Sequence, residues 1–144
     1  MQMKSSTLLR ANTAYYGVLQ LTHLGVLVRA GMIYLQTGTL PFPASPPTGG
    51  WSSQVLPFLF GLGGVDVAAI LLGISFAARM LIWDREARNL GLLSLTVAFS
   101  SAVVFAVGTI LTGAWAAQPI EYGLMVVLFA PLLPLFASLL DAGR

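Results

Sequence analysis

The stretch NTAYYGVLQLTHLGVLVRAGMIYLQ, residues 12–36, decides the fold class, because it is long and apolar yet repeatedly carries polar side chains. A helix of this length crosses a bilayer, whose hydrocarbon core spans about 20 helical residues. It contains Gln20, His23 and Arg29. Such groups are costly in hydrocarbon and normally face protein or a water-filled cavity. We therefore expect a transmembrane helix that packs against other helices of the same bundle.

The composition of the whole chain excludes a water-soluble fold. Of its 144 residues, 57% are hydrophobic and 8% are charged, whereas soluble domains have about 25% charged residues. The length holds about four spans and little else. The expected fold class is therefore all-α: a polytopic membrane protein with a four-transmembrane-helix bundle, forming a single domain over residues 1–144.

Polar and Pro/Gly-rich connections separate the four spans. Residues 37–54 contain four prolines and three glycines, a composition that prevents a regular helix, and we interpret this segment as an exterior loop. In the last span, Pro131 and Pro134 predict a bend in its second half. The expected spans are about residues 11–36, 55–83, 90–115 and 121–140.

Small residues predict where the helices approach one another. Gly64 and Ala68 form a small-xxx-small step, which is typical of close helix contacts in lipid. The third span contains no ionisable group, and its small residues recur along one face, which we interpret as a packing seam. This stripe comprises Ser94, Ala98, Ser101, Gly108 and Thr112, with Phe105 beside them.

The basic residues predict the orientation in the membrane. Loops 37–53 and 116–120 contain no Lys or Arg. By the positive-inside rule both termini are cytoplasmic, in what we expect to be a bacterial or archaeal plasma membrane (cell inner membrane). The apolar run after Arg10 is interrupted by polar residues, which favours a retained first span over a cleaved signal peptide. The basic residues at the helix ends opposite to these two loops are Lys4, Arg10, Arg79, Arg85, Arg88 and Arg144.

Polar residues of the first span form two neighbouring stripes when the helix is projected at about 100° per residue. Together they cover an arc too broad for a lipid-facing surface, so the first helix is expected to sit against the other three. One stripe comprises Tyr15, Thr22, Arg29 and Gln36, and the other comprises Tyr16, Gln20, His23 and Tyr34.

We expect a structural ion pair between Arg29 and Asp66, the deepest acidic residue in the chain. Their depths differ by about 6 Å, which an arginine side chain can bridge, and consecutive spans are usually neighbours. Glu121, in the first turn of the last span, is a rival partner. The pair either fixes helix register alone or forms the charged floor of a binding pocket or relay together with His23 and Gln20.

His23 has three interpretations: a neutral imidazole bonded to a neighbouring helix, a proton relay, or a donor to a quinone carbonyl. With one histidine and no cysteine, the chain alone offers no iron–sulfur, bis-histidine haem or multi-histidine metal site. We identify no catalytic residues and no metal ligands, and no basic cluster indicates nucleic-acid binding. No covalent cofactor is implied, which leaves quinone or lipid as the expected ligand.

Three runs resemble the DoxX-like family of small four-span membrane proteins: RAGMIYLQTG (29–38), LPFP (40–43) and GVDVAAILLG (64–73). The shared pattern is an arginine-led first helix, a Pro-containing loop and an acid followed by Leu-Leu-Gly in the second helix. Asp66 stands where the family tends to have Glu. The resemblance covers about the first half of the chain and implies a bundle associated with quinone-linked or redox membrane partners.

Three functions fit these features. The favoured one is a non-enzymatic accessory or structural subunit of a larger membrane complex, because the chain is small and lacks catalytic groups. The alternatives are a small oligomeric transporter or channel that uses Arg29, Asp66 and His23, and a lipophile- or quinone-binding membrane enzyme. The expected partners are membrane lipid and other membrane-protein subunits or further copies of the chain.

Overall fold

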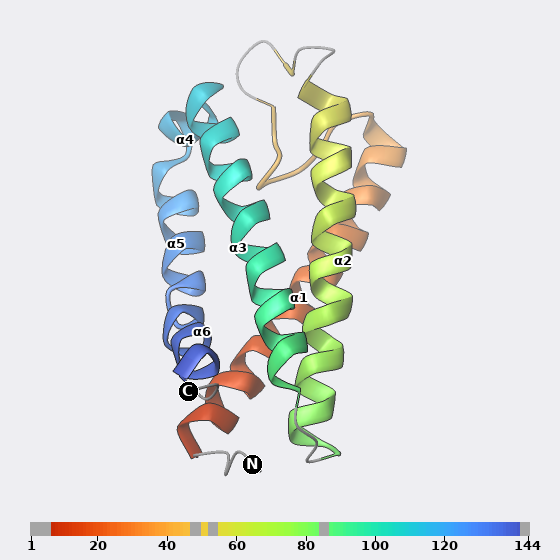
Figure 1. Cartoon of the computed structure of the whole chain (residues 1–144). Helices are drawn as coiled ribbons and strands as arrows, with labels where there is room; N and C mark the ends of the chain where they lie inside the picture. Colours follow the sequence, from red (N-terminus) through yellow and green to blue (C-terminus); the bar gives the residue numbers. More distant parts are fainter. Residues whose placement is uncertain (1–6, 47–49, 52–54, 84–86, 142–144) are drawn as a thin grey trace.

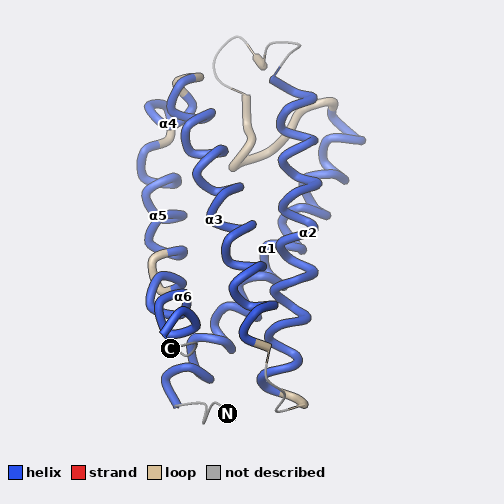
Figure 2. The backbone as a smooth tube through the Cα atoms, in the orientation of Figure 1, coloured by secondary structure: helices blue, strands red, loops and turns tan. Residues whose placement is uncertain are grey.

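A computed structural model describes residues 7–46, 50–51, 55–83 and 87–141 and confirms an all-helical membrane protein. Figure 2 shows helices joined by loops, with no strand in this described part. Four segments are long and apolar enough to cross a membrane, the last of them being α5 and α6 together. The helices are α1 (Thr7–Thr37), α2 (Val55–Leu81), α3 (Arg88–Leu111), α4 (Ala114–Ala117), α5 (Pro119–Phe129) and α6 (Leu132–Asp141).

The four segments form an up-and-down bundle (Figure 1). α1 begins and α6 ends at one end of the bundle, termed the terminal end; the other end is termed the loop end. α2 packs against both α1 and α3, and α6 packs against α1 and α3 near the terminal end. The main hydrophobic core lies there and comprises Leu9, Tyr16, Phe76, Met80, Ala87, Leu95, Leu132, Leu135 and Leu139.

Only the first half of α1 is inside the bundle. Its buried residues, Leu9, Thr13, Tyr16 and Gln20, are spaced four, three and four apart and therefore share one face. No residue of α1 after Gln20 is buried, and towards the loop end the helix leans away from α5 (Figure 1).

This tilt corrects the expectation that the whole polar arc of the first span faces the bundle. With 31 residues, α1 is about 46 Å long, which exceeds the hydrocarbon core of about 30 Å. A helix longer than the hydrocarbon thickness commonly tilts. The tilt carries the second half of α1 away from α5 and α6.

Gly73 marks the closest approach of the first three helices. A Cβ at this position would lie 2.8 Å from Gln20 Cγ and 3.1 Å from both Ser94 Oγ and Tyr16 Cε1. These distances are too short for most side chains, so glycine permits the three helices to meet here. Gly17 contributes on α1, because a Cβ there would lie 2.9 Å from the Cβ of Ala77.

The contact surface of α2 differs from the expected one. Ala69, Gly73 and Ala77 are buried and recur every four residues, which makes them the small-xxx-small series that packs. Gly64 and Ala68 are exposed, and nothing lies within 4 Å of a Cβ placed on Gly64. The Gly64–Ala68 step therefore does not form the helix contact.

The seam predicted on α3 is present in its first half. Ser94, Ala98 and Ser101 are buried, as expected for a face that packs. Farther along, Thr109 is buried whereas Gly108 is only half-buried. The buried face of α3 thus shifts by one residue between its two halves.

The third span ends at Leu111 rather than near Trp115. Gly113 has a φ of 77°, a left-handed conformation that favours glycine and ends the helix. The N–H of Thr112 donates to Gly108 O, and the N–H of Gly113 donates to Ile110 O. The chain then forms the short helix α4 before it re-enters the bundle.

The predicted bend in the last span is confirmed as a break between α5 and α6. Neither Pro131 nor Pro134 has a backbone N–H, so each leaves a carbonyl four residues earlier without its helical donor. Those carbonyls belong to Val127 and Ala130. The first accepts from the N–H of Ala130 at 3.3 Å and the second from that of Leu133 at 3.2 Å.

The Pro/Gly loop folds back onto the loop end of the bundle. The Tyr122 hydroxyl of α5 donates to Pro43 O at 2.7 Å, and the Phe42 ring meets the Tyr122 ring edge-on at 5.4 Å between centroids. Within the loop, Trp51 Nε1 donates to Ala44 O at 2.8 Å. The loop is therefore anchored to the bundle.

Arginines cap helix ends at the terminal end. Arg10 donates to Leu81 O at 3.4 Å, and Arg88 Nε donates to Leu139 O at 2.6 Å. These carbonyls lie in the last turns of α2 and α6, where a positive charge complements the helix dipole. These two arginines therefore link neighbouring helices on this side of the bundle.

Candidate functional site

Three side chains from three helices meet near the middle of the bundle. His23 Nε2 of α1 lies 3.9 Å from Asp66 Oδ2 of α2, and Ser101 of α3 donates its hydroxyl to Asp66 Oδ1. The side chains of His23 and Asp66 are 31% and 23% exposed, whereas Ser101 is buried. The three residues are referred to below as the central cluster.

The local sequence explains how the central cluster forms. Tyr16, Gln20 and His23 lie four and three residues apart and so share one face of α1. Ser94 and Ser101, seven residues apart, share one face of α3. The close approach at Gly73 brings both faces against α2.

Asp66 has one hydrogen-bond donor, Ser101, and one facing imidazole, that of His23. A carboxylate in a low-dielectric interior is costly unless donors or a positive charge satisfy it. Ser101 serves one oxygen, and the imidazole of His23 faces the other. A cluster of this kind can hold a proton or orient a polar ligand.

A second polar contact lies towards the terminal end. The Tyr16 hydroxyl lies 2.7 Å from Ser94 Oγ, and Ser94 Oγ donates to Ala69 O at 3.1 Å. Serine has one hydroxyl proton. Because that proton is directed to Ala69 O, Tyr16 is the donor to Ser94.

Gln20 lies between these two polar groups on α1. It is 3% exposed, and its Oε1 has no hydrogen-bond partner among the described residues. Leaving a buried acceptor unpaired costs about 1–3 kcal/mol. This oxygen is the one buried side-chain acceptor in the described part of the chain that is left unsatisfied.

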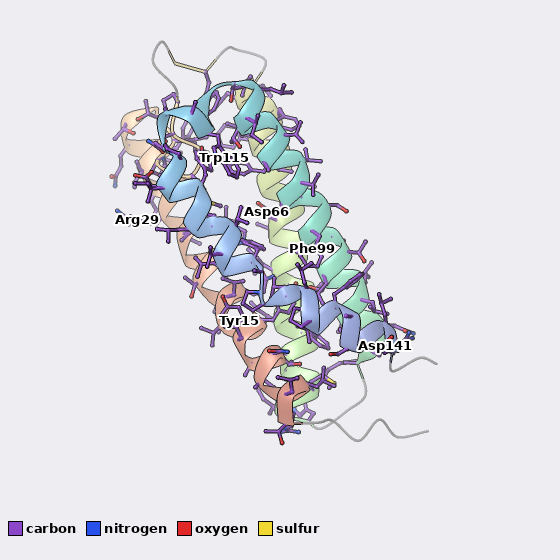
Figure 3. The ribbon with its side chains drawn as sticks, turned by 90° about the vertical axis from the view of Figure 1, so that its left-hand side faces the viewer. Tyr15, Arg29, Asp66, Phe99, Trp115 and Asp141 are labelled. Carbon is purple, nitrogen blue, oxygen red and sulfur yellow. The ribbon has the colours of Figure 1, made fainter. Side chains whose placement is uncertain are left out.

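Arg29 and Asp66 do not form the expected ion pair. Within the described residues, the charged-group partner of Asp66 at 4.0 Å or less is His23. Arg29 is exposed, and Figure 3 shows it at the margin of the bundle while Asp66 lies among the helices. Residue 29 is six positions after residue 23, about 240° around the helix. When His23 faces α2, Arg29 therefore faces elsewhere.

Glu121 also lies apart from the central cluster. It is exposed in the first turn of α5, and it forms no ion pair with Arg29 in the part of the chain that the structure describes. Of the five predicted site residues, the structure thus brings His23 and Asp66 together, places Gln20 one turn away, and separates Arg29 and Glu121 from them.

Three participants were not singled out in the sequence as site residues: Tyr16, Ser94 and Ser101. The serines lie in a stripe of small residues, where packing explains them equally well. The one feature of the sequence that could have suggested these serines as site residues is that they lie at a similar depth in the membrane to Gln20 and Asp66. Depth alone does not show which faces of two helices meet.

Two hollows lie away from the central cluster. A small hollow of about 70 Å³ at the loop end is lined by apolar side chains including Trp51, Phe58 and Phe105. It is smaller than typical ligand pockets of about 300–1,000 Å³. An open groove of about 540 Å³ lies beside Arg79 and Trp83 at the terminal end. No group of three or more metal-ligating side chains occurs in the described residues.

Comparison with known proteins gives limited similarity. No family model matches the sequence, and no solved structure matches it. Monocarboxylate transporter 11 from Homo sapiens is 30% identical over 86 residues, which is 59% of this chain and 18% of that transporter. The chain thus spans less than a fifth of the length of the relative that it matches.

Proposed function

We propose that this small membrane protein is a non-catalytic accessory subunit whose α1 completes a larger helix bundle. The observation that carries the proposal is the position of Arg29, which is exposed on the loop-end half of a membrane-spanning helix. Arginines within spans almost always face a bundle interior or an aqueous cavity. The helices of this chain do not bury Arg29, so we propose that a second membrane protein packs against it.

The surface around Arg29 has the composition of a helix contact. Thr22, Arg29 and Gln36 recur every seven residues and are all exposed, which forms one polar stripe along the second half of α1. Thr22 satisfies its hydroxyl within α1 by donating to Val18 O at 3.0 Å. Apolar Met32, 57% exposed, lies one turn from Arg29 and can pack against a neighbour.

Charge complementarity defines the partner. An unpaired arginine at the centre of a span costs about 2.5–3.5 kcal/mol on insertion scales. Arg29 is eight residues from the end of α1 at Thr37, about 12 Å along the helix, so the cost at its depth is below this central value and snorkelling relieves part of it. The partner we propose is a transmembrane helix of another protein with a carboxylate at the depth of Arg29.

Charge exchange tests this proposal. A photo-crosslinking residue at Met32 would capture the neighbour in native membranes and identify the contacting helix. Arg29→Glu should then abolish co-purification in mild detergent, and replacing the partner's acid with arginine should restore it. Arg79→Glu, which changes an exposed arginine of α2, is the matched control and should have no effect. Co-purification unaffected by Arg29→Glu would refute the proposal.

A second candidate is a small oligomeric transporter that uses the central cluster. Ionisable residues inside spans commonly mark ion or substrate pathways. The partial similarity to monocarboxylate transporter 11 supports this alternative and suggests a monocarboxylate as the solute to test. Uptake of a labelled monocarboxylate into proteoliposomes should fall at least tenfold with Asp66→Asn; equal uptake with and without the protein would eliminate this candidate.

Binding of quinone or lipid, and the resemblance to the DoxX-like family, remain predictions. We also propose that both termini face the cytoplasm. The supporting observation is that Arg10, Arg79 and Arg88 lie at helix ends on the terminal end of the bundle, in the first turn of α1, the last turn of α2 and the first turn of α3. The positive-inside rule assigns this side to the cytoplasm.

A further inference from the structure

We infer that the open groove beside Arg79 binds one anionic phospholipid, with the headgroup phosphate on the guanidinium and an acyl chain along the apolar walls. The groove has a volume of about 540 Å³, which lies within the range of about 300–1,000 Å³ typical of ligand pockets. It is formed by the last turns of α2 and the start of α3 and is lined by Ile74, Ser75, Ala78, Arg79, Trp83 and Leu90. The inference does not depend on the accessory role, because the polar stripe that includes Arg29 lies on the second half of α1, nearer the loop end.

The order of polarity along the groove matches that of a phospholipid. Arg79 is two residues before the end of α2 at Leu81, about 3 Å along the helix axis, so its guanidinium reaches the membrane–water interface. Ile74 lies five residues deeper, about 8 Å along the same axis. The groove therefore has a cation at the level of the lipid phosphates and an apolar wall at the level of the acyl chains.

Arg79 is available to a ligand. It is exposed, and it forms no ion pair or hydrogen bond within the part of the chain that the structure describes. By contrast, Arg10 and Arg88 donate to carbonyls of neighbouring helices. A guanidinium binds a phosphate through two parallel N–H···O bonds and balances the single negative charge of a phosphodiester. Basic pockets between membrane helices commonly bind anionic headgroups, so the expected ligand is a phospholipid with one net negative charge.

The deeper walls of the groove are apolar. Ile74 and Ala78 are four residues apart and share one face of α2, and Leu90, which packs against the main core, lines the groove from α3. Ser75 donates its hydroxyl to Leu71 O at 2.7 Å, so its one proton is not available to a ligand. The hydrocarbon of an acyl chain would cover these walls, whereas a soluble anion would leave them uncovered.

Trp83 lies at the interfacial end of the groove. The N–H groups of Ile82 and Trp83 both donate to Ala78 O, at 2.9 and 3.3 Å, which holds this segment against the last turn of α2. Trp83 is 59% exposed, so its indole is free to contact lipid. Tryptophan is enriched at the level of lipid headgroups, and its indole N–H adds a hydrogen-bond donor beside the guanidinium.

Trp83 also reports whether the groove is occupied. The chain has three tryptophans, and the other two, Trp51 and Trp115, lie at the loop end. The protein is reconstituted in phosphatidylcholine bilayers, and phosphatidylglycerol with brominated acyl chains, which quenches a nearby indole, is titrated in. Each sample is paired with its Trp83→Phe version, so that the difference in emission belongs to Trp83.

The relative binding constant for phosphatidylglycerol should be at least about fivefold higher than that for brominated phosphatidylcholine, the preference expected from one basic residue at an anionic headgroup. Arg79→Gln removes the charge and should abolish this preference. Arg79→Lys should retain most of it, because lysine also binds phosphate as a point charge. Equal quenching by the two lipids, or a preference that persists in Arg79→Gln, would overturn the inference.

Ala78→Leu distinguishes a lipid bound in the groove from general attraction of anionic lipid to a basic surface. The larger side chain fills the groove and leaves the guanidinium in place, so the preference should be lost. Ala68→Leu, at an exposed position of the same helix, is the matched control and should retain the fivefold preference. If Ala78→Leu does not fold, Ser75→Leu fills the same groove from an exposed position. A preference retained in a folded variant with a filled groove would also overturn the inference.

Discussion

At the scale of single residues, the most consequential position is Gly73. α1, α2 and α3 meet at this point, and a Cβ would lie 2.8 Å from Gln20 Cγ. The central cluster and the Tyr16–Ser94 contact lie on either side of it. The absence of one side chain therefore positions residues from three helices.

We expect Gly73→Val to destabilise the bundle by about 1–3 kcal/mol, the usual cost of overpacking. The branched side chain would push α1 away and separate His23 from Asp66. The measurement is the free energy of unfolding in a mixed-micelle denaturation series. Gly64→Ala is the control, because nothing lies within 4 Å of its new methyl group; it should be neutral or slightly stabilising. Equal effects of the two substitutions would contradict this role of Gly73.

Tyr16→Phe isolates the interhelical hydrogen bond from α1 to α3. Ser94 keeps its bond to Ala69 O but loses the donor from Tyr16. The expected cost is about 0.6 kcal/mol, the average for such bonds in membrane bundles, and at most about 1.7 kcal/mol. The same unfolding assay measures it, with Tyr34→Phe as the matched control. A stability loss above that range would show that Tyr16 does more than donate this bond.

At the scale of elements, the loop after α1 is held by α5. Tyr122 is 2% exposed, donates to Pro43 O and stacks on Trp115 at 5.2 Å between ring centroids, with an interplanar angle of 15°. The tilt of α1 separates it from α5 at the loop end, and the loop contacts α5 there instead. A segment with many prolines and glycines is thus fixed by aromatic side chains.

Tyr122→Ala should release the loop, because it removes a buried aromatic ring that contacts Phe42. We expect a loss of about 3–5 kcal/mol in local stability, as for other buried aromatic truncations. The labelling rate of a cysteine introduced by Ser45→Cys should rise at least tenfold. Tyr122→Phe, which loses only the hydrogen bond to Pro43 O, should raise it by about tenfold or less. Unchanged labelling in Tyr122→Ala would show that the loop is held by other contacts.

At the scale of the whole molecule, the bundle is asymmetric. The large core lies at the terminal end, where arginines bind helix carbonyls. The loop end has a smaller aromatic cluster around Tyr122. The two ends of the bundle therefore differ in packing and in charge. The orientation in the membrane follows from this difference between the ends, and no single residue sets it.

The chain has no cysteine, so single cysteines report orientation without background. Asp141→Cys should react with a membrane-impermeant maleimide only in inverted vesicles or after permeabilisation, and Thr39→Cys should react in intact cells. The physical reason is the retention of positively charged segments on the cytoplasmic side. The reverse pattern of reactivity would contradict cytoplasmic termini.

The sequence by itself determined the membrane class, the four spans and a bend at Pro131 and Pro134, because hydropathy, length and a missing backbone N–H are local properties. It also identified His23 and Asp66 as candidate site residues from their chemistry. Only the tertiary structure decided that His23, and not Arg29, lies beside Asp66. That outcome depends on how α1 is rotated and tilted. The close approach at Gly73 fixes the rotation, and the excess of helix length over bilayer thickness favours the tilt. Composition, depth and spacing do not contain that information.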